Sequence, residues 1–185
     1  WNYGFGHYVL LAETVRRCTG GQVRLLDRPK ARVAARFGRR VQIFPGVSPA
    51  FADCRPRTRP DAWTDAFLAR RLGWAPRDRW KDLTNAYSSL DRAVLGTFAA
   101  SVPTASSGEA PPGTDAARTW FDNAGVLIAR PGDEARACRL AVALKGGHNA
   151  EHHNHNDVGS YVAVVGRRML LADPGSEIYT ARTVS

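Results

Sequence analysis

The apolar residues of the first hundred positions recur with the period of an α-helix. In the stretch HYVLLAETVRRC they fall on one helical face, and the Thr-Gly-Gly that follows is typical of a helix end. Asp61 is the expected N-cap of a later helix, which Gly73 ends. We therefore expect residues 1–100 to be mainly helical, with a short extended piece and a turn at 41–51. The predicted helices span 7–18, 27–38, 59–73 and 84–100.

Residues 101–117 (SVPTASSGEAPPGTDAA) break the helical pattern and indicate a linker or long loop. Beyond this linker the period changes to that of β-strands. Gly166-Arg167 separates the last two apolar runs, which predicts a β-hairpin. Helices followed by antiparallel strands predict an α+β protein whose strand domain spans 118–185. The predicted strands span 124–132, 138–147, 159–166 and 168–175.

These elements complete neither a helical bundle nor a β-sandwich. We therefore expect the chain to be a piece of a longer, multidomain protein. No run of apolar residues is long enough to span a bilayer, so no membrane-spanning segment is expected. Cys18, Cys54 and Cys138 are far apart and form no CxxC pair, so we interpret them as free or core cysteines with at most one bridge.

Four of the five histidines lie in GGHNAEHHNHND, residues 146–157. If this stretch is extended, His153, His155 and Asp157 face the same side. The hairpin that follows returns the chain at LLADPGS, which brings Asp173 towards the histidines. Imidazole nitrogen and carboxylate oxygen are both zinc ligands. The pattern predicts a metal site, an acid/base site or both, and a solvated His-rich loop is the alternative.

Positive charge is concentrated in the helical half. Residues 1–100 carry 18 Lys and Arg against 8 Asp and Glu, whereas 101–185 carry 8 against 9. Almost all these cations are arginines, whose forked guanidinium binds carboxylates, sulfates and phosphates through two hydrogen bonds. A basic surface suits an acidic polysaccharide or a nucleic acid. Use of arginine as an ordinary solvated cation explains the same charge equally well.

The stretch HNHNDVGSYVAVVGRRMLLADPGSEIYTA resembles the central motif of the heparinase II/III-like polysaccharide lyases: His-x-His-x-Asp, a hairpin, then Asp-Pro-Gly. WFDNAGVLIARPG resembles the strand that opens the β-domain of that family, and WNYGFGHYVLLAETVR resembles a late helix of its (α/α) toroid. The resemblance is strongest over 120–181. It implies a partial toroid followed by an antiparallel β-sandwich.

The resemblance implies an enzyme that cleaves uronic-acid polysaccharides by β-elimination in a secreted or periplasmic setting. On the matching positions, His153 is the catalytic histidine, and His155 and Asp173 are zinc ligands whose third partner is expected beyond residue 185. The toroid tyrosine corresponds to Tyr8, with Tyr3 as the other candidate and a packing aromatic as the alternative. We assign substrate binding to His148 and Asn154, which both belong to the stretch 146–157.

Three other functions remain open. A different zinc-supported carbohydrate enzyme could use the same scaffold, and a non-catalytic carbohydrate-binding or structural protein could keep the zinc-stabilised β-domain. The positive charge would suit nucleic-acid binding, but the sequence has no recognised nucleic-acid-binding motif and no interleaved aromatic residues. No nucleic-acid partner is therefore expected. The expected partner is an acidic polysaccharide, and the sequence carries no signature of a particular oligomeric state.

Overall fold

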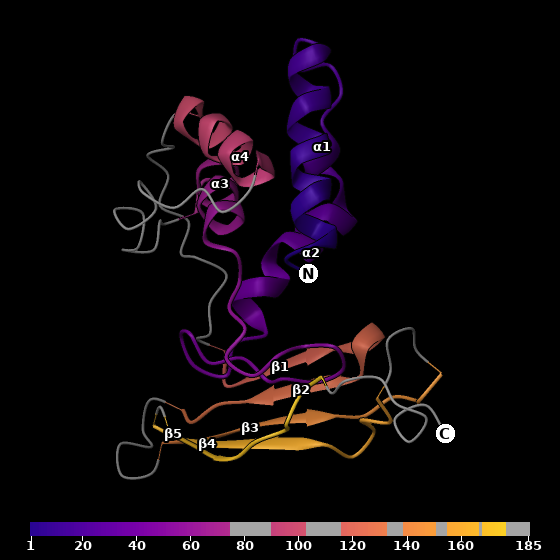
Figure 1. The fold of residues 1–185 in the computed structure, drawn as a ribbon, viewed down its shortest axis with the longest axis vertical. Coiled ribbons are helices and arrows are strands. Elements are labelled where there is room, and N and C mark those ends of the chain that lie inside the picture. The colour runs from indigo at the N-terminus through magenta and orange to yellow at the C-terminus, as the bar shows by residue number, and fades with distance from the viewer. Residues whose placement is uncertain (75–89, 103–115, 133–138, 151–154, 167, 177–185) are drawn as a thin grey trace. The chain divides into compact units, whose positions relative to one another are not determined.

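The computed structural model describes residues 1–74, 90–102, 116–132, 139–150, 155–166 and 168–176. Within this part of the chain, four α-helices accompany one five-stranded antiparallel sheet, which confirms the α+β class (Figure 1). The chain divides into two compact units. The first unit comprises Trp1–Arg39 and Pro60–Gly113, and the second comprises Arg40–Arg59 and Thr114–Ser185.

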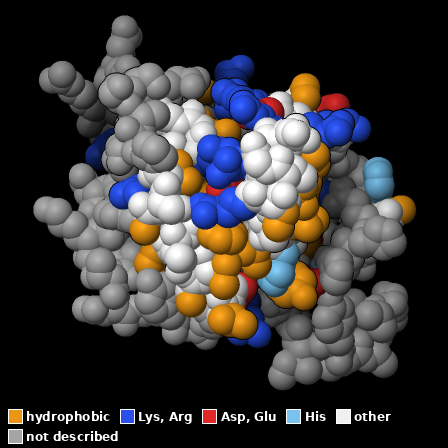
Figure 2. Space-filling view, turned by 90° about the horizontal axis from the view of Figure 1, so that it is seen from above, with side chains coloured by type: hydrophobic (Ala, Val, Ile, Leu, Met, Phe, Trp, Pro, Cys, Tyr) orange, Lys and Arg blue, Asp and Glu red, His pale blue; other side chains and the backbone are white. Residues whose placement is uncertain are grey.

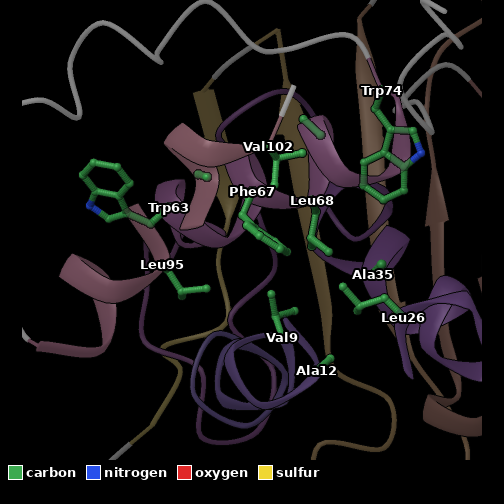
Figure 3. Close-up of a cluster of buried hydrophobic side chains, with 12 residues drawn as sticks. Val9, Ala12, Leu26, Ala35, Trp63, Phe67, Leu68, Trp74, Leu95 and Val102 are labelled. Atoms are coloured by element: carbon green, nitrogen blue, oxygen red, sulfur yellow. The ribbon is translucent and has the colours of Figure 1, made fainter. Parts of the chain in front are cut away.

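The first unit is built from helices that bury one apolar face each. Val9 of α1 and Phe67 and Leu68 of α3 are fully buried at the centre of the core, where Figure 3 shows them pointing towards one another. The sequence predicted α1, α2 and α3 to within a few residues, and α4 follows the later part of the predicted helix 84–100. The bounds are α1 Gly4–Cys18, the 3-10 helix η1 Leu25–Asp27, α2 Pro29–Arg40, α3 Ala62–Leu72 and α4 Leu90–Ser101.

Helix α3 begins and ends as its sequence predicts. The Asp61 carboxylate accepts hydrogen bonds from the backbone N–H and the hydroxyl of Thr64, both at 2.9 Å. Gly73 ends the helix in the left-handed conformation, with φ at 74°. Asp61 also accepts a hydrogen bond from Arg92 of α4 at 2.8 Å, so one carboxylate both caps α3 and ties α4 to it.

The second unit holds a sheet whose strands follow one another in chain order (Figure 1). All neighbouring strands are antiparallel, and Gly166, with φ at 62°, lies in the turn of the predicted β4–β5 hairpin, which is confirmed. The first strand was not among the predicted ones, because its buried position holds Thr119 and its exposed position holds Trp120, the reverse of the expected alternation. The strands are β1 Arg118–Phe121, β2 Val126–Ala129, β3 Leu140–Lys145, β4 Tyr161–Val165 and β5 Arg168–Leu171.

One face of the sheet is a buried core. A row of four fully buried residues crosses β1 to β4 in register and consists of Thr119, Ile128, Ala143 and Val162. This core includes Ile43, Phe44 and Phe51, which come from the stretch 40–59 that interrupts the helical half. The stretch turns back on itself at Gly46, since the Ile43 N–H donates to the Val47 carbonyl at 2.7 Å. The extended piece and turn predicted at 41–51 therefore complete the core of the sheet.

Buried Arg130 fastens this stretch to the sheet. Its guanidinium donates to the carbonyls of Arg40 at 2.7 Å, Gln42 at 2.6 Å and Ile43 at 3.1 Å. It also donates to the Thr119 hydroxyl at 2.9 Å. The guanidinium has five N–H donors in a rigid fork and can bind several carbonyls at once. A lysine ammonium has only three donors and could not bind all of these acceptors.

The opposite face of the sheet carries exposed apolar side chains. Trp120, Leu144 and Tyr161 belong to one row across the strands and are each between 41% and 53% exposed. An antiparallel sheet with one face in water normally alternates apolar and polar residues. This sheet therefore presents a second apolar layer on its outer face. Among the described residues, no helix is both long and apolar enough to cross a membrane.

Candidate functional site

The histidine motif lies on the connection between β3 and β4. The two ends of this connection are paired, because the Lys145 N–H donates to the Ser160 carbonyl and the Gly159 N–H donates to the Lys145 carbonyl, both at 2.9 Å. The buried Lys145 ammonium donates to the Ala124 carbonyl at 2.8 Å and the Gly146 carbonyl at 3.2 Å. The base of the loop that presents the histidines is thus fixed by the sheet.

His155 contacts a carboxylate from the stretch 40–59. Its Nε2 lies 2.8 Å from Oδ1 of Asp53, and the His155 side chain is 14% exposed against 39% for Asp53. A carboxylate beside one ring nitrogen orients an imidazole for work at the other, whether as a metal ligand or in proton transfer. Sequence reasoning missed Asp53, since Phe-Ala-Asp-Cys-Arg-Pro carries no local signal of such a contact.

Asp157 is buried and holds the backbone next to Asp53. Its side chain is 6% exposed, and Oδ2 accepts a hydrogen bond from the Ala52 N–H at 2.8 Å. Residues 155–157 are not extended as the alternation argument assumed, because Asn156 adopts a left-handed conformation with φ at 59° and these three residues belong to no strand. Asparagine tolerates this conformation better than most residues. Asp157 therefore turns towards the stretch 50–54.

The Asp-Pro-Gly motif reaches the same stretch. The Gly175 N–H donates to Oδ1 of Asp173 at 2.8 Å, and the Ser176 N–H donates to the Cys54 carbonyl at 3.2 Å. Gly175 has φ at 76°, and a Cβ there would lie 2.5 Å from the Cys54 oxygen. Only glycine allows this approach, which explains why the turn carries it.

Residues 52–54 thus contact both predicted motifs. His155 and Asp53 supply a ring nitrogen and a carboxylate oxygen, which are donors of the kinds that zinc binds. No group of three His, Cys, Asp or Glu residues arranged to hold a metal occurs in the described part of the chain. Within the described ranges, Asp173 therefore does not join His155 and Asp53 in a three-ligand group.

The remaining predicted residues of the motif have different placements. His148 is exposed, and its Nδ1 accepts a hydrogen bond from the Ala150 N–H at 3.2 Å, which forms a local turn. His153 and Asn154 lie outside the described residues. Cys54 and Cys18 are free thiols, and Cys138 also lies outside the described ranges.

Tyr8 packs within the first unit. Its hydroxyl donates to the Leu25 carbonyl at 3.0 Å, and its ring stacks on Phe5 with a centroid separation of 5.6 Å. Half-buried Tyr8 also packs against the helical core. These are the contacts of a packing aromatic with a satisfied hydroxyl, the alternative that the sequence left open. Tyr3 is exposed, and its ring lies 4.7 Å from that of His7.

An ionic cluster surrounds the fully buried side chain of Glu13 on α1. Arg16 donates to both carboxylate oxygens at 2.9 and 2.7 Å, Arg17 donates at 2.9 Å, and Arg71 of α3 lies 3.5 Å away. Burial opposes the charge of Glu13, but the hydrogen bond from Arg16 and the charges of Arg71 and Arg16 outweigh it. The pKa of Glu13 therefore lies below its ordinary value.

A small pocket opens beside this cluster. Its charged lining consists of Arg16, Arg24 and Arg71 with Glu13 and Asp27, so the cations exceed the anions by one. Burial lowers the pKa of Arg71, which its attraction to Glu13 only partly offsets. Lys and Arg side chains also gather on the face shown in Figure 2.

Comparison of the sequence with protein-family models and with curated proteins gives no match. The functional assignment accordingly depends on the residues and contacts described above.

Proposed function

We propose that this protein is a lyase that cleaves uronic-acid polysaccharides by β-elimination. The observation that carries the proposal is the common contact of the histidine motif and the Asp-Pro-Gly motif with residues 52–54. Asp157 accepts a hydrogen bond from Ala52, and Ser176 donates one to Cys54. A shared active site requires this proximity, whereas a solvated His-rich loop does not.

The reaction removes the proton on C5 of the uronate and breaks the bond between C4 and the glycosidic oxygen. The C5–H electron pair becomes the C4–C5 double bond, and the leaving oxygen takes up a proton. Because C5–H is a very weak acid, charge that develops on the carboxylate needs preorganised donors. We assign the proton transfer to His153, whose imidazole exchanges protons near neutral pH, and substrate contacts to His148 and Asn154.

We assign zinc binding to His155 and Asp173. When bound, zinc would supply a cross-link between the β3–β4 connection and the turn after β5. This division leaves His153 for the substrate, because a histidine cannot exchange protons at the nitrogen that holds a metal.

The finer architecture that we propose is a partial (α/α) toroid followed by a β-sandwich in a longer, secreted or periplasmic protein. The exposed apolar face of the sheet supports the sandwich, since a second sheet packed on that face would bury Trp120, Leu144 and Tyr161. Arginines around the Glu13 pocket support an anionic partner, and a uronate carboxylate or a sulfate ester has the matching charge.

One observation favours a non-catalytic carbohydrate-binding protein on the same scaffold. The Tyr8 hydroxyl already donates to the Leu25 carbonyl. Tyr8 is therefore a packing residue, and we assign no proton transfer to it. A binder of this kind would retain acidic polysaccharide without forming a new double bond.

Elimination creates an unsaturated uronate that absorbs ultraviolet light, so a panel of uronate polymers tests the proposal directly. We expect His153→Ala to abolish most turnover while the metal content and the melting temperature stay unchanged. His155→Ala should lose metal, stability and activity together, and His7→Ala, at an exposed histidine of α1, serves as the matched control. Polymer binding without any unsaturated product would establish the non-catalytic alternative instead.

A further inference from the structure

Asp53 belongs to none of the motifs found in the sequence, yet its carboxylate contacts His155. We propose that Asp53 is the positioning residue of His155: its Oδ1 accepts a hydrogen bond from Nε2–H at 2.8 Å and fixes the imidazole in that tautomer. A metal ion held by this ring then binds through Nδ1. The metal part of this inference rests on the function proposed for His155.

The backbone on both sides of Asp53 is held by the two motifs. Ala52 donates to the Asp157 carboxylate at 2.8 Å on one side, and Cys54 accepts from the Ser176 N–H at 3.2 Å on the other. Ala52 itself has φ at 53°, a conformation that costs free energy in any residue other than glycine. Such strain persists where the surroundings determine the backbone, so the turn presents the Asp53 carboxylate in a set direction.

This arrangement matches a general requirement of metal-binding imidazoles. A ligating histidine commonly donates its second N–H to a carboxylate, which selects the tautomer, orients the ring and raises the basicity of the ligating nitrogen. Asp53 and His155 have this relation although they are 102 positions apart in the sequence. The contact is only partly exposed at His155, so water competes weakly for the ring.

The tautomer can be observed without any metal. Long-range 1H–15N correlation of the His155 ring, at a pH where the imidazole is neutral, should show Nε2 protonated in the wild-type chain. Asp53→Ala should shift the ring towards a mixture of tautomers. Asp53→Asn should preserve the wild-type tautomer, because the amide oxygen still accepts a hydrogen bond. Asp122→Asn, at an exposed carboxylate of the same unit, should change nothing.

Zinc competition titration provides the second readout. Asp53→Ala should weaken zinc binding about 10- to 100-fold, the usual effect of losing such a partner, and Asp53→Asn should weaken it less. An unchanged tautomer and unchanged zinc affinity in Asp53→Ala would overturn the inference, as would a metal bound to Nε2. A tautomer that follows Asp53 in a protein that binds no zinc would support the positioning contact and overturn the proposed metal role of His155.

Discussion

Individual side chains carry charge into places that water does not reach. Glu13, Arg130 and Lys145 are all less than 10% exposed, and each has several hydrogen-bond partners. An isolated buried charge costs several kcal/mol, so the partners decide whether it is tolerated. For Arg130 and Lys145 the partners are mainly backbone carbonyls, and for Glu13 they are arginines.

The Glu13 cluster predicts a specific dependence of stability on pH. Its lowered pKa means that the folded protein keeps this carboxyl ionised to lower pH than the unfolded chain, whose value is about 4.3. The stabilisation is therefore complete above the unfolded pKa and is lost as the pH falls through the folded one. Glu13→Gln should lower the free energy of unfolding by about 3 kcal/mol at neutral pH, as measured by urea denaturation.

The same variant should also show a flatter loss of stability in acid, because the titrating group is gone. Asp122→Asn, at an exposed carboxylate, is the control and should keep the wild-type pH profile. An equally steep acid limb in Glu13→Gln would mean that other carboxylates carry the effect.

Single segments decide whether the sheet has a complete core. The stretch 40–59 supplies Ile43, Phe44 and Phe51 to that core, and Arg130 holds the start of the stretch through three carbonyls. Removing the guanidinium leaves buried carbonyls without donors, each of which costs about 1–3 kcal/mol. Arg130→Ala should therefore lower the free energy of unfolding by about 3 kcal/mol or more.

Hydrogen exchange can localise this effect. The Ile43 amide, which donates to Val47, should exchange much faster in Arg130→Ala, while the Trp74 amide of the α3 cap should keep its protection. Arg130→Lys should fall between the wild type and the alanine variant, because an ammonium has fewer donors and a different geometry. Uniform loss of protection would show that Arg130 supports the whole molecule rather than one segment.

Local sequence patterns predicted most elements and few of the contacts. The helical period located α1 to α3, the Asp61 cap and Gly73 set the ends of α3, and alternation found β2 to β5. These features depend on residues within one or two turns of each other. The membership of 40–59 in the sheet core and the contact of Asp53 with His155 depend on residues about 75 to 120 positions apart, and no local pattern encodes such pairings.

The whole molecule carries a net charge of +9, concentrated in its first hundred residues. We expect retention on an immobilised acidic polysaccharide that weakens steeply with salt, because exposed charges are screened within about 10 Å at 0.1 M. Replacing Arg24 by Gln at the pocket should lower retention more than Arg118→Gln in the sheet unit, which removes the same charge elsewhere. Equal losses would assign retention to net charge alone, and absent retention at low salt would rule out this partner.

The sheet unit is discontinuous in the sequence, and this has a consequence for synthesis. Ile43, Phe44 and Phe51 leave the ribosome long before β1 to β5, whose side chains eventually cover them. Until translation reaches the last strands, these apolar groups have no partner in the sheet and remain available to chaperones or to neighbouring nascent chains. The helices can therefore begin to fold as they are synthesised, but residues 40–59 cannot complete their packing until β5 has been made, which ends about 110 positions later.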